Sequence, residues 1–268
     1  MLRSATRADL PAIRDLLVRA NETPYDIARV AEEKVFGVGF HGPPEVRVFD
    51  DGGSIAGVAV MCGRALRLIG VDPARRCRGV GRALLPPTAH VAFAEPANYF
   101  TPGVVESDEA TRRFFIANGF VESRWTFNLD ASDLPVEAPP GVVRASAGHR
   151  DRILEFIARE FGRIWRFEVS RAFDNDPVTL FVAEQQGKIA GFAAHDVNNR
   201  GLGFFGPTGV AKTLRGRGYG RLLLTASLAD LRRLGYARAV IPWTDAVDFY
   251  RKSCGATVTA RFVTMSRE

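Results

Sequence analysis

The sequence predicts an α/β protein made of two tandem copies of one domain, each a mixed β-sheet flanked by helices. Two observations support this prediction. Strand-like and helix-like segments alternate along the chain, which is typical of α/β folds. Four segments also recur in the same order, at offsets of 134 to 141 residues. A repeat of this kind indicates that the two halves share one fold.

Each half opens with a short extended piece and an amphipathic helix. The first half begins with "LRSATRADLPAIRDLLVRA" and the second with "VVRASAGHRDRILEFIARE". Thr6 can cap the first helix together with Asp9, three residues later. Apolar residues recur at helical spacing in both segments: Leu10, Ile13, Leu16 and Leu17, then Ile153, Leu154 and Ile157.

Further along, each half contains a β-hairpin and then a short helix. The stretches "VRVFDDGGSIAGVAVM" and "LFVAEQQGKIAGFAAH" are pairs of apolar runs joined by a polar turn, which is the pattern of a hairpin. The stretches "EATRRFFIANGF" and "DAVDFYRKSCGA" read as short helices that stop at a glycine.

The predicted boundary between the halves is "ASDLPVEAPPG", residues 131–141. It contains three prolines and no apolar periodicity, which is the composition of a linker. We therefore expect an N-terminal domain at residues 1–130, the linker at 131–141, and a C-terminal domain at 142–268.

The composition favours a soluble globular protein. Apolar residues make up 46% and charged residues 25% of the chain, and the net charge is +6. Most basic residues are arginines scattered along the sequence, as on a solvated surface, so no nucleic-acid partner is expected. No apolar stretch approaches the roughly 18 residues of a membrane span, and no membrane association is expected.

Cysteine usage and the N-terminal residues favour a cytoplasmic location. Cys62, Cys77 and Cys254 are far apart and odd in number, so they form neither a disulfide framework nor a metal-ligand pattern. No metal is expected. The first residues, "MLRSATRADL", lack the apolar segment of a signal peptide.

A glycine-rich loop occurs in both halves, in "TLRGRGYGRLLL" (residues 213–224) and "ARRCRGVGRALL" (residues 74–85). Two common phosphate-binding patterns do not fit it. In "GPTGVAKT", Ala211 stands where a P-loop needs its second glycine. The dinucleotide pattern G-x-G-x-x-G also fails, because the last position after Gly216 and Gly218 is Arg221.

The remaining pattern is Arg-x-x-Gly-x-Gly, which reads Arg215, Gly218, Gly220 in one half and Arg76, Gly79, Gly81 in the other. With "TGVAKTL" before it, "RLLLTASLADLRRLGY" behind it and "DFYRKSCGA" further on, the sequence resembles the GNAT family of acyl-CoA-dependent N-acetyltransferases. The resemblance covers nearly all of both halves. It implies two tandem acyl-CoA N-acyltransferase (GNAT) domains, each with a mixed, splayed β-sheet flanked by helices, and acetyl-CoA as the cosubstrate.

Physical chemistry supports the same role for the loop. Successive backbone N–H groups of a glycine loop at a helix N-terminus form a cradle for an anion, and the neighbouring arginines add positive charge. A plain tight turn with solvated arginines is the alternative. The resemblance implies that Val210 N–H is the candidate oxyanion donor. The resemblance implies these cofactor-binding residues: Thr208, Gly209, Val210, Ala211, Arg215, Gly216, Arg217, Gly218, Tyr219, Gly220 and Arg221.

The C-terminal half is the expected catalytic copy, and the N-terminal half a degenerate one. Pro86 and Pro87 must end or kink the N-terminal helix after the loop. By resemblance, Tyr250 occupies the position of the tyrosine that lies near the cofactor sulfur in many GNAT enzymes, which makes it the candidate acid. Its N-terminal counterpart is Phe114 or Phe115, and phenylalanine has no proton to give.

The general base and the acceptor are less sharply indicated. Asp245 follows the predicted fifth strand and is the first candidate base, with His195 and Asp196 as alternatives. Trp165 and Trp243 offer aromatic faces to the acceptor. The tandem layout resembles GNAT proteins that acetylate glucosamine, so the expected partner is a small-molecule amine such as an amino sugar. Acetylation of a protein or peptide amine, and a non-catalytic role as an acyl-CoA-binding regulator, stay open.

One departure from the family concerns the end of each half. About 11 residues lie between Gly119 and the linker, and about 13 residues follow Gly255. Each stretch has room for one strand instead of the two-stranded hairpin that usually closes a GNAT domain. We expect the other half to supply the missing wall. The sequence does not indicate an oligomeric state.

Overall fold

The computed structural model describes all residues from Met1 to Glu268 and divides into two compact units. Unit 1 comprises Met1–Thr126 and Ala260–Glu268, and unit 2 comprises Phe127–Thr259. The division in space therefore runs through two strands, whereas the predicted boundaries at 131 and 142 describe the sequence repeat. None of the helices is both long enough and apolar enough to cross a membrane.

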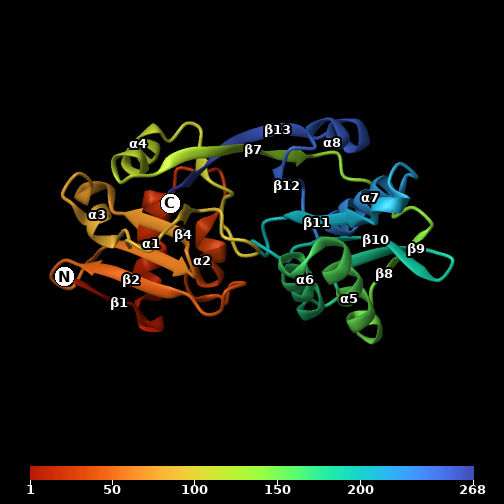
Figure 1. Cartoon of the computed structure of the whole chain (residues 1–268), viewed down its shortest axis with the longest axis horizontal. Coiled ribbons are helices and arrows are strands. Elements are labelled where there is room, and N and C mark those ends of the chain that lie inside the picture. Colours follow the sequence, from red (N-terminus) through yellow and green to blue (C-terminus); the bar gives the residue numbers. More distant parts are fainter. The chain divides into compact units, whose positions relative to one another are not determined.

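Unit 1 is built on a mixed sheet with helices packed against it (Figure 1). Strands β1 to β4 are antiparallel neighbours, β5 runs parallel to β4, and β13 pairs with β5 and β6. Its elements are β1 (Leu2–Ser4), α1 (Leu10–Ala20), α2 (Ile27–Phe36), β2 (Glu45–Asp50), β3 (Ile55–Cys62), β4 (Ala65–Val71), α3 (Val80–Leu84), β5 (Val91–Ala92), β6 (Val104–Val105), α4 (Glu109–Ala117), the start of β7 (Val121–Ala131) and the end of β13 (Thr257–Ser266).

Unit 2 repeats the order of elements. The four-stranded antiparallel sheet has the order β11-β10-β9-β8, and β12 pairs instead with the end of β7. The elements are β8 (Val142–Arg144), α5 (Arg150–Phe161), α6 (Arg163–Ser170), β9 (Leu180–Gln185), β10 (Lys188–His195), β11 (Phe205–Val210), α7 (Tyr219–Arg233), β12 (Ala239–Thr244) and α8 (Val247–Cys254).

The four-stranded sheet of unit 2 is buried on both faces, because alternate side chains of a strand point to opposite sides. Leu180 and Val182 of β9 join the apolar cluster that contains the buried side chains of α5. Phe181 and Ala183 of the same strand join the cluster that contains those of α7. Burial of a large apolar side chain contributes about 1.5–3 kcal/mol, so these two clusters hold α5 and α7 on opposite faces of the sheet.

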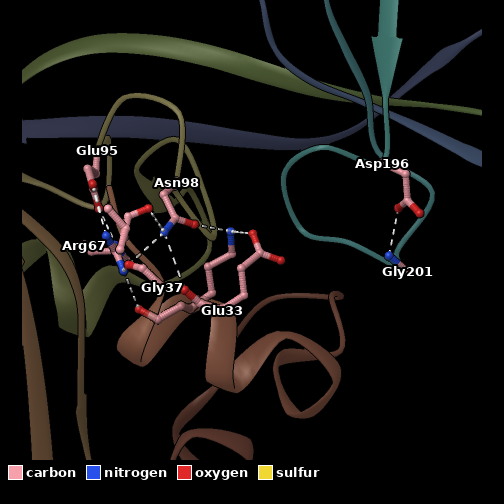
Figure 2. A network of polar contacts seen from close by, with 9 residues as sticks. Glu33, Gly37, Arg67, Glu95, Asn98, Asp196 and Gly201 are labelled. Carbon is pink, nitrogen blue, oxygen red and sulfur yellow. Dashed lines mark hydrogen bonds and ion pairs between the residues drawn. The ribbon is translucent and has the colours of Figure 1, made fainter. Parts of the chain in front are cut away.

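A buried charged pair lies in unit 1. Arg67 of β4 and Glu95 are both fully buried and form an ion pair. Arg67 also donates to the carbonyl oxygens of Lys34 (3.1 Å) and Gly37 (2.8 Å) at the end of α2. Figure 2 shows this network together with Asn98. Removing one member would leave the other as an unpaired buried charge.

The helix after the glycine loop differs in length between the two halves. α3 has only five residues and ends at Leu84, and its C-cap residue Leu85 immediately precedes Pro86, whereas α7 has fifteen residues. This confirms the expectation that the prolines end the N-terminal helix. Each half also closes with a single strand, β7 or β13, as the short segments after Gly119 and Gly255 predicted.

Candidate active site

The glycine loop of unit 2 leads directly into α7. Gly216 and Gly218 have φ angles of +78° and +88°, which side-chain-bearing residues rarely adopt. No heavy atom lies within 4 Å of the place where a β-carbon on either residue would project. The first N–H groups of a helix have no partner within the helix. The loop therefore leaves open space at the positive end of α7, which is suited to an anion.

The arginines around this loop are free to meet an anion. Arg217 and Arg221 are exposed and take part in no ion pair, and Arg215 Nε donates to the carbonyl oxygen of Val210 (3.3 Å). A guanidinium with no protein partner can form charge-assisted hydrogen bonds with a phosphate. This loop combines backbone donors, a helix N-terminus and unpaired positive charge.

The matching loop of unit 1 keeps only part of these properties. Gly79 keeps a left-handed conformation, with φ of +80°. Arg76 pairs with Glu22 (3.3 Å), however, and Arg75 pairs with Asp51 (3.0 Å). The helix that follows has only five residues. Arg78 and Arg82, the counterparts of Arg217 and Arg221, are exposed and take part in no ion pair. The short helix and the two paired arginines make the loop of unit 1 the weaker anion site.

Strands β11 and β12 separate from each other beside the loop of unit 2. They meet in one parallel bridge, Phe204 with Val240, where Val240 N–H donates to the carbonyl oxygen of Gly203 (2.9 Å). Beyond this bridge they belong to different sheets, and β11 is an edge strand. The result is a free backbone edge on β11, as in the splayed sheet that the sequence predicted.

The direction of the peptide groups on this edge follows from the strand pairing. Ala211 N–H donates to the carbonyl oxygen of Ala190 on β10 (2.9 Å). Because peptide groups alternate in direction along a strand, the N–H of Val210 points to the open side. Val210 therefore offers a backbone donor where a carbonyl oxygen of a ligand lying along β11 could be bound.

Tyr250 lies on α8 and packs against the start of β11. Its side chain is buried, and its ring meets that of Phe205 edge-on, with centroids 6.2 Å apart. Burial, with a smaller contribution from Cys254, raises the pKa of the Tyr250 hydroxyl well above its ordinary value of 10.0. The phenol therefore keeps its proton at neutral pH, as a general acid must.

The residues proposed for the acceptor lie at the end of β12 and on α6. Trp243 is half-buried, and Asp245 is exposed between β12 and α8. Trp165 stacks on Phe161, with ring centroids 5.3 Å apart and an interplanar angle of 21°. Phe161 in turn lies against Gly209 of β11. The aromatic pair of unit 2 thus packs on the same strand that carries Val210.

Phe161 was not among the residues selected from the sequence. Its ring carbons lie 2.5 and 2.6 Å from the position of a β-carbon on Gly209. The sequence pattern indicated Gly209 only as part of the cofactor-binding segment. Phe161, which contacts it, lies 48 positions earlier in the sequence. The only signal for this contact was that a strand contained a glycine, which often marks a close approach.

The two alternative bases are used elsewhere in the fold. His195 is fully buried, and its Nε2 lies 2.9 Å from Asp230 Oδ2. Asp196 accepts hydrogen bonds from the Tyr236 hydroxyl (2.9 Å) and from Gly201 N–H (2.7 Å, Figure 2). His195 is shut off from solvent and Asp196 already accepts two hydrogen bonds, so both are less suited than an exposed carboxylate to take a proton from an amine. Asp245, in the exposed turn between β12 and α8, is the candidate base that we take forward.

A cavity of about 90 Å³ lies in unit 1, beside Leu68–Gly70 of β4 and Val104–Val105 of β6. In the repeat, these segments correspond to the regions of β11 and β12. Glu22 and Asp108 are among the polar residues that line it, with Phe93 and Phe100 among the apolar ones. No group of three or more His, Cys, Asp or Glu side chains is arranged to hold a metal ion.

Comparison with protein-family models matches residues 150–256 to the acetyltransferase (GNAT) family. This match covers the loop, the splayed strand edge and α8 described above. Residues 150–256 belong to the GNAT family. The family prediction made from the glycine loop is thereby confirmed, and so is the fold class of two tandem GNAT domains.

Relatives of the GNAT chain are found by sequence and by structure. The mycothiol acetyltransferase of Clavibacter sepedonicus is 31% identical over 199 residues, which are 67% of this chain and 62% of that protein. The chain thus spans less than two thirds of that relative's length.

Two solved structures share the fold over the whole chain. A GCN5-related glucosamine N-acetyltransferase region of a fungal GH3 β-N-acetylglucosaminidase superposes with a TM-score of 0.81 at 16% identity, over 99% of this chain and 38% of that one. A tandem GNAT protein from the clavulanic acid biosynthesis pathway has a TM-score of 0.70 at 18% identity, over 100% of this chain and 98% of that one. At these identities the likeness concerns the fold alone.

Proposed function

We propose that this GNAT protein is an acetyl-CoA-dependent N-acetyltransferase that acts on the primary amine of a small molecule, and that unit 2 carries the reaction. One observation carries the proposal. The open, unpaired glycine loop, the free edge of β11 and the buried phenol of Tyr250 occur together in unit 2. Unit 1 differs in two respects, because the helix after its loop has only five residues and phenylalanines occupy the tyrosine position.

The residues of unit 2 fit coenzyme A. The backbone N–H groups at the start of α7, with Arg217 and Arg221, offer donors and positive charge to a diphosphate. The outward peptide groups of β11 can pair with the amides of a pantetheine arm, as one strand pairs with another. Gly216 and Gly218 leave the space that an approaching phosphate needs.

Each step of acetyl transfer can then be given to a residue. Asp245, directly or through water, takes the proton that the amine loses as its nitrogen attacks the thioester carbon. Val210 N–H donates to the oxygen on which negative charge develops. The new C–N bond forms, the C–S bond breaks, and Tyr250 gives its proton to the departing sulfur. The high pKa of this buried phenol keeps it protonated until that moment.

The proposed acceptor is an amino sugar. Two observations support this choice. Trp165 and Trp243 are half-buried and lie near β11 and at the end of β12, and aromatic faces suit the apolar face of a sugar ring. One structural neighbour is described as a glucosamine N-acetyltransferase region. The relative found by sequence is named mycothiol acetyltransferase.

The test is release of the CoA thiol from acetyl-CoA in the presence of an amine panel. The panel contains glucosamine, other amino sugars, simple alkyl amines, and peptides with a free N-terminus or lysine. The proposal predicts turnover with an amino sugar, and no thiol release without an amine because attack is direct. Turnover with peptides alone would make the protein a peptide acetyltransferase. Tight CoA binding with no turnover would make it a non-catalytic acyl-CoA-binding protein.

A further inference from the structure

The last strand of the N-terminal half, β7, enters unit 2 and lies beside β12, which carries the candidate acceptor residue Trp243. Residues Phe127–Ala131 of β7 pair antiparallel with β12. Apart from Ala131, these residues precede the predicted linker in the sequence, so they come from the copy that we consider non-catalytic. The catalytic unit thus contains a strand from the other copy.

The pairing between these strands contains a β-bulge. Ile241 pairs with Leu129 and Thr244 pairs with Phe127. Two residues of β12, at positions 242 and 243, therefore stand opposite the single residue Asn128. A bulge of this kind bends its strand and re-aims the side chains that follow. Here the bend falls immediately before Asp245 and the start of α8.

One side chain satisfies the backbone of this bulge. Residue 242 is a proline and has no N–H group. The N–H of Trp243 donates to Oδ1 of Asn128, at 2.9 Å. Asn128 is fully buried, so this hydrogen bond is shielded from water, and its loss would leave a donor without its partner.

The conformation that Asn128 supports is a strained one. Trp243 has a φ of +49°, in the left-handed region that costs a bulky residue on the order of 1–3 kcal/mol. Residues in such conformations persist only where their surroundings hold them there. At this position, the hydrogen bond from Trp243 N–H to Asn128 Oδ1 helps to hold the Trp243 backbone.

We infer that Asn128 is a positioning residue of the acetyltransferase site, which sets where Trp243 and Asp245 face the acceptor amine. The inference rests on the proposed function and adds a role for the N-terminal copy. Asn128 touches no substrate and acts through the bulge. It should therefore affect the amine more than acetyl-CoA, whose proposed contacts lie on β11 and the glycine loop.

The test compares three single variants. Asn128→Leu has a similar size but no acceptor oxygen, and Asn128→Asp keeps an oxygen acceptor whether or not the carboxyl is ionised. Thr259→Val is the matched control, because the Thr259 hydroxyl bonds Asn128 O (3.4 Å) and Asp130 Oδ1 (3.1 Å) in the same sheet region and has no contact with Trp243 among the hydrogen bonds of the structure. If Asn128→Leu fails to fold, Asn128→Ala replaces it.

The kinetic readout separates the two substrates. Asn128→Leu should lower kcat/KM for the amine by about ten-fold, the equivalent of one lost buried hydrogen bond, and leave the KM for acetyl-CoA unchanged. Asn128→Asp should recover most of the loss, and Thr259→Val should show none. Equal losses in the Leu and Val variants, or no loss in either, would overturn the inference.

A second readout does not depend on catalysis. Trp125, Trp165 and Trp243 are the three tryptophans of the chain. In a Trp125→Phe/Trp165→Phe background, the fluorescence of Trp243 reports its own surroundings. Adding Asn128→Leu should shift the emission and increase quenching by acrylamide, and adding Thr259→Val should do neither. If the wild-type protein turns over no amine, the proposed function fails while this measurement still decides the position of Trp243.

Discussion

The ring of Phe161 on α5 lies against Gly209 on β11, with two ring carbons 2.5 and 2.6 Å from the place of a glycine β-carbon. Phe161 also meets Phe192 of β10 at 5.3 Å and stacks on Trp165. The absence of a side chain on Gly209 therefore allows the α5–α6 corner to approach the strand that we propose binds the cofactor arm. This contact links Trp165, a proposed acceptor residue, to β11, the proposed cofactor-binding edge.

Gly209→Ala tests this contact. The added methyl group has no room unless Phe161 moves, and overpacking of this kind costs about 1–3 kcal/mol. We expect a lower melting temperature and a loss of kcat/KM for both substrates. Gly220→Ala is the stability control, because its β-carbon would meet Phe249 at an ordinary 3.5 Å. The double variant Phe161→Ala/Gly209→Ala should lose less stability than the sum of the single variants, and simple additivity would contradict the account.

The loop arginines give a prediction with a matched pair of variants. Replacing Arg217 and Arg221 with alanine should raise the KM for acetyl-CoA by about ten-fold or more, because charge-assisted bonds to phosphate contribute about 1.5–3 kcal/mol each. Replacing Arg78 and Arg82 with alanine changes the matching positions in the loop of unit 1 and should leave that KM unchanged. Steady-state kinetics at two salt concentrations measures both. Equal effects in the two loops would contradict the assignment.

Tyr250→Phe should lower kcat by about 10²-fold or more, the usual contribution of a general acid, with little change in the KM for acetyl-CoA. Tyr236→Phe is the control, since it removes a hydroxyl that bonds Asp196 at 2.9 Å and lies outside the proposed mechanism. It should cost stability but not kcat. A fully active Tyr250→Phe would remove this residue from the mechanism.

The raised pKa of Tyr250 also predicts a pH dependence of stability. The folded state favours the protonated phenol. The contribution of Tyr250 to the free energy of unfolding is therefore complete below the ordinary pKa of 10.0 and is lost as the pH rises above that value. Unfolding by denaturant should therefore become easier above pH 10, and less so in Tyr250→Phe. Identical alkaline profiles for the two proteins would show that burial does not raise this pKa.

Asp230 gives the opposite pH dependence. It is almost fully buried on α7, and burial acts to raise its pKa. Hydrogen bonds from His195, Arg144 and Arg233 outweigh this and hold the pKa below the ordinary 3.8. The stabilising contribution of Asp230 is thus complete above pH 3.8, and it is lost as the pH falls through the lower pKa of this carboxyl in the folded state.

Asp230→Asn should therefore destabilise the protein by about 3–5 kcal/mol, as expected for one broken member of a buried charged group. It should also flatten the acid limb of the stability curve. Asp248→Asn changes an exposed carboxylate that pairs with Arg251 at 3.4 Å, and the expected loss is below about 1 kcal/mol. Denaturant titrations between neutral and acid pH measure both, and similar losses in the two variants would argue against a special role for Asp230.

The fold could be predicted largely from local signals. The polar turns of the hairpins, the glycines that need positive φ and the prolines after α3 each act within a few residues, and the structure contains them as expected. The family pattern around Arg215 combined several such signals. It therefore identified the loop and α8 without knowledge of the long-range contacts.

The features that could not be predicted depend on contacts between distant residues. His195 was a candidate base because it ends a hairpin strand. Its burial depends on Asp230, 35 positions later. The role of Asn128 depends on the pairing of β7 with β12, and the Arg67–Glu95 pair depends on a loop folded over β4. No pattern within a short window of sequence marks any of these contacts.

The most direct test of the central claim is hydrogen exchange at the backbone amides with and without coenzyme A. The account predicts slower exchange on CoA binding at residues 208–211 and 215–221, where the edge of β11 and the loop before α7 lie. CoA that binds without slowing exchange in the 215–221 loop would contradict the claim that this turn holds the diphosphate.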